Sequence, residues 1–238
     1  MISSNLRRYF LWHVRDFVRD RGYAILIVGI LLGFTIIGPV RGMGRTIDAP
    51  FAKTMLAAIL TQVGFILPFI TLNGIVSTDR KMGYYRFLFS KPVSITAYYV
   101  QLFIVYFIGF LAAVLILLGI FAVFAYPLSP FRPLLYCAIV YLSLGGIAFL
   151  VSTLFRYDWP ILAGIFLGSA LLHSMWQGYE GWRRMILAVL PPLYKLTGML
   201  PAVMNRGEVE TNDILWLLGY SAICFAAGLF VLRKRPFG

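Results

Sequence analysis

The chain has 238 residues, of which 61% are hydrophobic and only 13% are charged. A soluble domain carries roughly a quarter charged residues and no long apolar runs, so this composition excludes an ordinary soluble protein. The formal net charge of +12 is divided among short segments between apolar runs, whereas nucleic-acid binding needs basic residues gathered on one surface. Flanking charge on a membrane protein, attracted by anionic lipid headgroups, explains the excess instead.

The first 21 residues predict an amphipathic helix that lies in the membrane interface. Its apolar positions recur at helical spacing and are Leu6, Phe10, Val14 and Phe17. The arginines fall elsewhere on the helix, as is typical of a helix lying flat on a leaflet. We expect it to lie on the cytoplasmic leaflet and brace the first span. His13 belongs to this helix and is interpreted as a boundary residue, not as a ligand or a pH switch.

Six apolar runs are long enough to cross about 30 Å of hydrocarbon, which takes about 20 residues in a helix. The predicted spans are 22–40, 54–77, 98–125, 133–155, 159–177 and 214–232. No acid or base occupies the middle of a span, which argues against a proton-driven antiporter. Both cysteines, Cys137 and Cys224, lie inside apolar runs, so neither a disulfide framework nor a metal-binding spacing is indicated.

A few polar side chains interrupt the spans. Gln62 and Asn73 are the costliest to expose to lipid, so we expect them to face either other helices or a translocation path. Ser169 and His173 lie one helical turn apart on the fifth span. Intramembrane serine proteases of the rhomboid type place the serine and the histidine on different helices. A hydrogen bond within or between helices is therefore the simpler interpretation. All four residues remain candidates for the path.

Two Gly-x-x-x-Gly patterns lie in the spans, at Gly29 and Gly33 and at Gly164 and Gly168. Such patterns allow two helices to approach closely. We expect both to serve packing within the chain, with a dimer contact as the alternative.

The apolar stretch 183–204 is interrupted by Pro191 and Pro192 and ended by Pro201. Each half has about 8 to 10 residues and is too short to cross the bilayer. Proline inside a helix removes a hydrogen bond and clashes with the preceding turn. The stretch therefore predicts a re-entrant hairpin of two half-helices before the last span. An amphipathic surface loop is the alternative.

The orientation follows from the Lys and Arg residues near the span ends. The larger share lies in the segments that are cytoplasmic if the N-terminus is inside. Both termini are therefore expected in the cytoplasm, together with the loop between the second and third spans.

That loop, residues 77–103, alternates basic and aromatic side chains. Residues 79–90 predict a short cytoplasmic helix that ends before Lys91-Pro92, because a residue preceding proline is disfavoured in a helix. Exposed aromatic side chains are costly unless a partner covers them, and aromatic and Arg side chains are common interface anchors. The loop therefore predicts a docking site, with an ordinary basic loop that only sets topology as the alternative.

The loop also resembles a known family. The order Asp79-Arg80-Lys81-Met82-Gly83, Leu88, Ser90-Lys91-Pro92-Val93-Ser94 and Tyr98-Tyr99 is similar to that of the permease subunit of ABC-2 type transporters. Two positions depart from the family pattern: Asp79 stands where Glu is commoner, and Gln101 stands where Lys is usual.

The resemblance implies an all-α polytopic fold with an interfacial N-terminal helix, six spans, a cytoplasmic coupling helix and a re-entrant hairpin. It implies a dimer with a second permease subunit, identical or different, in a bacterial or archaeal plasma membrane. Separate ATPase subunits would dock on the 79–90 helix, at Asp79, Arg80, Gly83, Arg86, Phe87 and Phe89. The sequence lacks a G-x-x-x-x-G-K-[ST] phosphate loop, so ATP and Mg would be used by the partner, and no cofactor or metal is expected on this chain.

The expected function is export of a lipidic, amphipathic or peptide-like substrate. The alternative is a membrane scaffold or assembly factor that recruits a cytoplasmic partner through the same loop. An intramembrane enzyme lacks a credible catalytic set.

Overall fold

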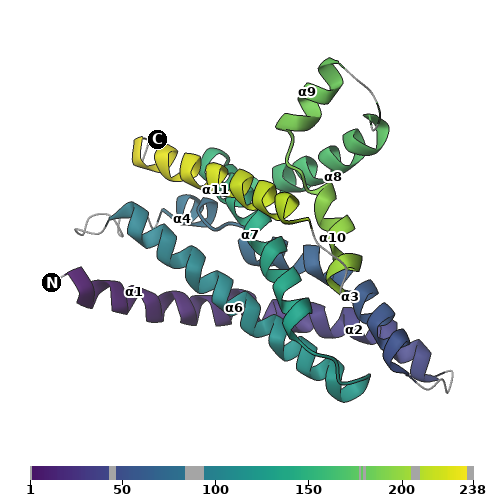
Figure 1. Cartoon of the computed structure of the whole chain (residues 1–238). Helices are drawn as coiled ribbons and strands as arrows, with labels where there is room; N and C mark the ends of the chain where they lie inside the picture. The colour runs from purple at the N-terminus through teal and green to yellow at the C-terminus, as the bar shows by residue number, and fades with distance from the viewer. Residues whose placement is uncertain are drawn as a thin grey trace.

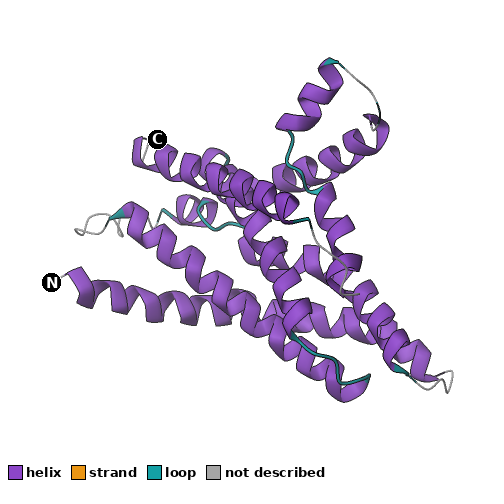
Figure 2. Cartoon of the chain, viewed as in Figure 1, coloured by secondary structure: helices purple, strands orange, loops and turns teal. Residues whose placement is uncertain are grey.

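The computed structural model describes residues 2–42, 47–83, 94–176, 178, 181–204 and 210–234. These residues form helices joined by turns and short loops, with no strand among them (Figure 2). The predicted all-α class is confirmed. Both ends of the chain and the short helix α4 (Ser77–Met82) lie at one end of the bundle, as an even number of crossings requires (Figure 1).

Among the described residues, six helical stretches are long and apolar enough to cross a membrane. They are Tyr9–Pro39, Ala49–Asp79, Ile95–Phe124, Phe131–Leu154, Asp158–Trp176 and Thr211–Lys234. The predicted number of spans is confirmed, although several stretches extend beyond the predicted bounds. Apolar runs mark the part of a helix that suits hydrocarbon, whereas capping residues decide where the helix ends.

The first stretch belongs to a longer helical segment that includes the N-terminal amphipathic residues. This segment consists of α1 (Ile2–Phe17), the π-helix η1 (Val18–Gly22) and α2 (Tyr23–Gly42). The expected junction between an interfacial helix and a span is therefore a π-helical turn and not a loop. The whole stretch runs beside α6 (Ile95–Phe124) in the same direction. Three ring pairs mark this contact: Tyr9–Tyr98 at 6.0 Å, Phe17–Tyr106 at 5.3 Å and Phe34–Phe124 at 5.8 Å.

Helix α7 (Phe131–Leu154) lies at the centre of the bundle, and 72% of its most apolar 18-residue segment is buried. Helix α11 (Thr211–Lys234) packs along it (Figure 1). The Ser221 hydroxyl of α11 accepts from the Gly146 N–H at 3.0 Å and donates to the Leu142 carbonyl at 2.5 Å. A Cβ on Gly146 would overlap the Ser221 backbone, so the glycine permits this close approach.

Helix α3 (Ala49–Leu72) lies between α2 and α7 and begins at a capping residue. The Asp48 carboxylate accepts from the Phe51 N–H at 3.0 Å, and Pro50 occupies the first turn. Both features are typical of a helix start, because the first N–H groups lack partners within the helix. Helix α6 begins in the same way at Ser94.

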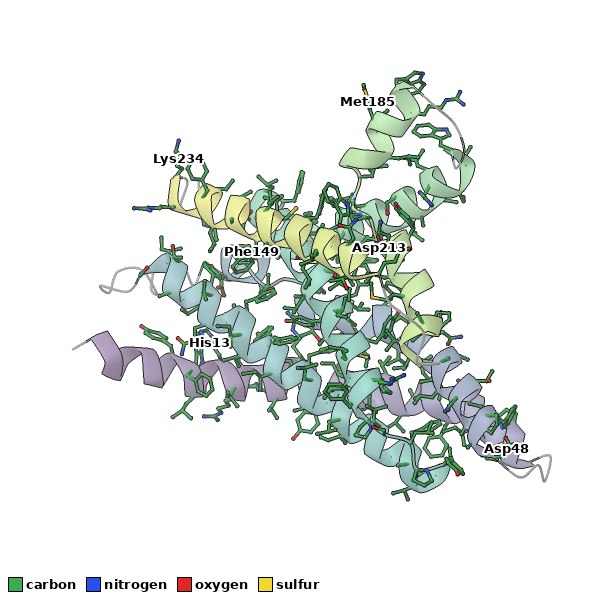
Figure 3. All side chains as sticks on the ribbon, viewed as in Figure 1. His13, Asp48, Phe149, Met185, Asp213 and Lys234 are labelled. Atoms are coloured by element: carbon green, nitrogen blue, oxygen red, sulfur yellow. The ribbon has the colours of Figure 1, made fainter. Side chains whose placement is uncertain are left out.

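Helix α8 (Asp158–Trp176) is followed by two short helices, α9 (Trp182–Val189) and α10 (Tyr194–Met204). Pro191 and Pro192 separate α9 from α10, as predicted, while entry of the pair into the bilayer stays a prediction. Helix α10 packs on α3 and α7, and Arg132 of α7 donates to its Val203 carbonyl at 3.2 Å. Helix α9 carries Met185, which is 74% exposed and lies away from the rest of the bundle (Figure 3).

The two Gly-x-x-x-Gly patterns differ in what their glycines contact. In the first pattern a Cβ on Gly29 would overlap the Leu117 side chain, so Gly29 packs α2 on α6, whereas no described atom lies within 4 Å of a Cβ on Gly33. At Gly164 and Gly168 no described atom lies within 4 Å of the position that a Cβ would take. The expectation that this second pattern packs within the chain is therefore wrong, and α8 presents it outward.

Candidate functional site

The turn between α3 and α4, residues 73–76, is buried from Gly74 onward and is held by side chains from distant spans. The Gly74 N–H donates to Oδ2 of Asp158 at 2.9 Å. The Ser152 hydroxyl accepts from the N–H groups of Val76 and Ser77, at 3.0 and 2.9 Å. Gly74 has φ +72°, a left-handed conformation that glycine adopts without strain. The turn therefore has a defined attachment to α7 and to the start of α8.

A third attachment comes from the first span. Arg21, at the end of η1, donates to the Ile70 carbonyl at 2.5 Å and to the Thr71 carbonyl at 3.5 Å. These carbonyls belong to the last turn of α3, where helix carbonyls lack partners within the helix. Residues 73–77 with Arg21, Ser152 and Asp158 are called the α4 root below.

Helix α4 itself touches two further elements. The Asp79 carboxylate is half-buried and accepts from the Tyr99 hydroxyl of α6 at 3.2 Å. The Lys81 ammonium lies 5.0 Å from the centre of the Tyr157 ring, in the turn between α7 and α8, a distance typical of a cation–π contact. Among the described residues, hydrogen bonds and a cation–π contact thus connect α4 and its root to η1, α3, α6, α7 and α8.

The predicted docking residues fall at and beyond the end of α4. Asp79 faces α6, and Arg80 lies in α4 with its side chain outside the described residues. Gly83 ends the helix with φ +68°. Arg86, Phe87 and Phe89 lie outside the described residues. The described helix begins at Ser77, two residues before the predicted start, because the buried turn sets its first residue.

The predicted path residues do not form one cluster among the described contacts. Gln62 is exposed on α3. Asn73 is exposed at the end of α3 and lines a pocket against α8. Ser169 is buried and donates to the Phe166 carbonyl of its own helix at 3.0 Å. His173 stacks on Tyr194 of α10 with ring centres 3.6 Å apart.

Ser169 and His173 therefore have separate partners. No hydrogen bond joins the two side chains in the part of the chain that the structure describes. A nucleophile needs its base within hydrogen-bond reach, so this geometry gives no support to a hydrolytic pair. Within the same described ranges, no group of three or more His, Cys, Asp or Glu side chains is arranged to hold a metal ion.

Pockets between the described spans include one that is almost wholly apolar and lies between α2, α3 and α6, with a cavity volume of about 50 Å³. Another lies between α3 and α8, has a cavity volume of about 390 Å³, and includes Asn73 and Asp158 in its lining. The second pocket adjoins the α4 root, because Asp158 belongs to both.

Three residues of the root were not predicted from the sequence: Arg21, Ser152 and Asp158. Arg21 resembled an ordinary flanking arginine, and Ser152 was one of several hydroxyls in the spans. Asp158 offered the best signal, because an acid directly before a span start is costly to bury without a partner. Its partner, Gly74, lies 84 residues away in the chain and could not be inferred.

No family model and no curated protein matches this chain.

Proposed function

We propose that this chain is the permease subunit of an ATP-binding cassette transporter, driven by separate ATPase subunits. The α4 root is the observation that carries the proposal. A force applied to the segment after α4 would act on a buried turn that hydrogen-bonds directly to α7 and α8. The end of α3 that leads into this turn is bonded by Arg21 of η1. Buried hydrogen bonds have no competing water, so the turn and the span ends are expected to move as one body.

The docking surface would begin at the exposed end of α4. Asp79 is engaged by Tyr99, so its role would be to orient α4 on α6. Lys81 is exposed, and Gly83 turns the chain toward the basic and aromatic segment that contains Arg86, Phe87 and Phe89. That segment would seat in the ATPase, and Arg80 would add charge at its edge. ATP and Mg would be bound by the partner.

Two permease subunits would form the translocation path. One six-span chain provides half of a path with twelve spans, and α8 presents Gly164 and Gly168 on a face that no described residue covers. Close helix approach at such a face supports α8 as part of the subunit contact. The apolar pockets favour a lipidic, amphipathic or peptide-like substrate over an ion.

Co-purification with an ATPase tests this proposal. Cells expressing the tagged chain are solubilised, and the bound ATPase is identified and its hydrolysis measured. The double variant Arg86→Glu with Phe87→Ala is expected to weaken ATPase binding about tenfold or more, because charged and aromatic anchors dominate interfaces. Arg233→Glu, an exposed charge reversal at the end of α11, is the matched control and should bind normally.

Two results would count against the proposal. One is an ATPase that binds the double variant as well as the original chain. The other is a bound partner without nucleotide hydrolysis, which would favour the scaffold function.

A further inference from the structure

The pocket between α3 and α8 has the dimensions and lining of a small-molecule site. Its cavity volume of about 390 Å³ falls within the roughly 300–1,000 Å³ typical of ligand pockets. Its wall is aromatic and aliphatic, and includes Phe69 and Ile70 of α3 and Leu162, Ala163 and Phe166 of α8. Such a wall suits a hydrocarbon chain.

The polar part of this pocket is a carboxylate that lacks a full set of partners. Asp158 is 3% exposed, and only its Oδ2 has a hydrogen bond, from the Gly74 N–H. Its Oδ1 has no hydrogen-bond partner among the described residues. A buried, unsatisfied acceptor is costly, and more so when it is charged. Asn73, which is exposed in the same lining, adds an amide beside it.

We propose that this pocket binds an amphiphile with a primary ammonium group, whose hydrocarbon part lies along the α3–α8 wall. The ammonium would donate to Oδ1 of Asp158 and neutralise the carboxylate, since buried charges are normally paired. The Gly74 N–H holds the other oxygen, so the carboxylate stays fixed while the ligand binds. This inference does not depend on the transport function, because the binding is measured at equilibrium without an ATPase.

The ammonium group has two possible sources. It belongs either to a free long-chain amine or to the ethanolamine headgroup of a bilayer phospholipid. Both offer the same donor to Asp158 and differ in size and in where they reside.

Photolabelling of the purified full-length chain in phosphatidylcholine nanodiscs tests the site. The probe is a dodecylamine that carries a diazirine, and the control probe is the corresponding alcohol. The amine is expected to label peptides of α3 and α8 with half-saturation about tenfold lower than the alcohol, the range that a charge-assisted hydrogen bond supplies. Adding phosphatidylethanolamine to the nanodiscs should compete if the lipid headgroup is the natural source, and should leave labelling unchanged if a free amine is.

Two variants locate the effect. Asp158→Asn keeps an oxygen for the Gly74 N–H, and should abolish the difference between amine and alcohol. Ala163→Phe fills the pocket and should block both probes, whereas Ala170→Phe, on an exposed position of the same helix, should block neither. Equal labelling by amine and alcohol in the original chain, or labelling of Ala163→Phe at the original level, would overturn the proposal even if Asp158→Asn does not fold.

Discussion

Single hydroxyl and carboxylate groups hold the turn that leads into α4. Every buried backbone N–H needs an acceptor. In the turn at 73–77 the N–H groups of Gly74, Val76 and Ser77 find theirs on Asp158 and Ser152, whereas those of Asn73 and Ile75 bond to carbonyls of α3. These long-range bonds give the turn one arrangement. These individual hydrogen bonds therefore determine how α4 is placed on the spans.

Ser152→Ala should destabilise the protein by about 1–3 kcal/mol, because two buried N–H groups lose their acceptor. Thermal unfolding of the detergent-solubilised protein measures the change. Ser174→Ala is the matched control, since its hydroxyl is exposed and bonds only to its own helix, and it should be close to neutral. Equal shifts in the two variants would contradict the role given to Ser152.

Gly146→Ala should be strongly destabilising, because the added Cβ overlaps the Ser221 backbone and forces α7 and α11 apart. Gly219→Ala, at an exposed position of α11, offers the comparison: its Cβ meets no described atom, and alanine favours a helix by about 1 kcal/mol over glycine. Unfolding temperatures of the two variants are compared. A tolerated Gly146→Ala would show that the helices do not pack this closely.

At the scale of elements, α10 is fastened to the last span by an ion pair. Lys195 at the start of α10 donates to the Asp213 carboxylate at the start of α11, and both side chains are about a quarter exposed. The hydrogen bond to Asp213 raises the pKa of Lys195 above its ordinary value of 10.5. The pair therefore contributes stability that is fully present below pH 10.5 and is lost as the pH rises through the raised pKa.

Lys195→Ala should accordingly lower stability by about 0.2–1 kcal/mol at pH 8, the value typical of partly exposed pairs. The difference from the original chain should vanish above the raised pKa of Lys195. Unfolding curves at pH 8 and at strongly alkaline pH measure both statements. The exchange Lys195→Asp with Asp213→Lys is the control and should recover most of the loss at pH 8. A difference that is independent of pH would show that Lys195 acts by packing alone.

The elements also show what an amino-acid pattern can and cannot predict. The apolar spacing of the N-terminal segment correctly indicated a helix, because that spacing is a local property. The π-helical continuation at Val18–Gly22 was not predictable, because it follows from packing on α6. The Pro191-Pro192 pair correctly separated α9 from α10, since proline acts on its own turn.

At the scale of the whole molecule, the six spans followed from length and hydropathy alone, because hydrocarbon thickness fixes both. The site was predicted only in part. The charged and aromatic segment after Asp79 is a contiguous pattern, whereas the α4 root joins Gly74 to Asp158 and Val76 to Ser152, 84 and 76 residues apart. Such pairs are products of the tertiary fold, and one sequence does not reveal them.

If the chain is a permease subunit as proposed, the α4 root transmits the movement of the ATPase to the spans. A single cysteine at Ala163, in a chain with Cys137→Ala and Cys224→Ala, reports on the α3–α8 pocket through its rate of maleimide labelling. Trapping the bound ATPase with ATP and vanadate should change that rate several-fold. Adding Ser152→Ala should abolish the change while the ATPase still co-purifies. An unchanged rate on trapping, or the same change with Ser152→Ala, would contradict the claim.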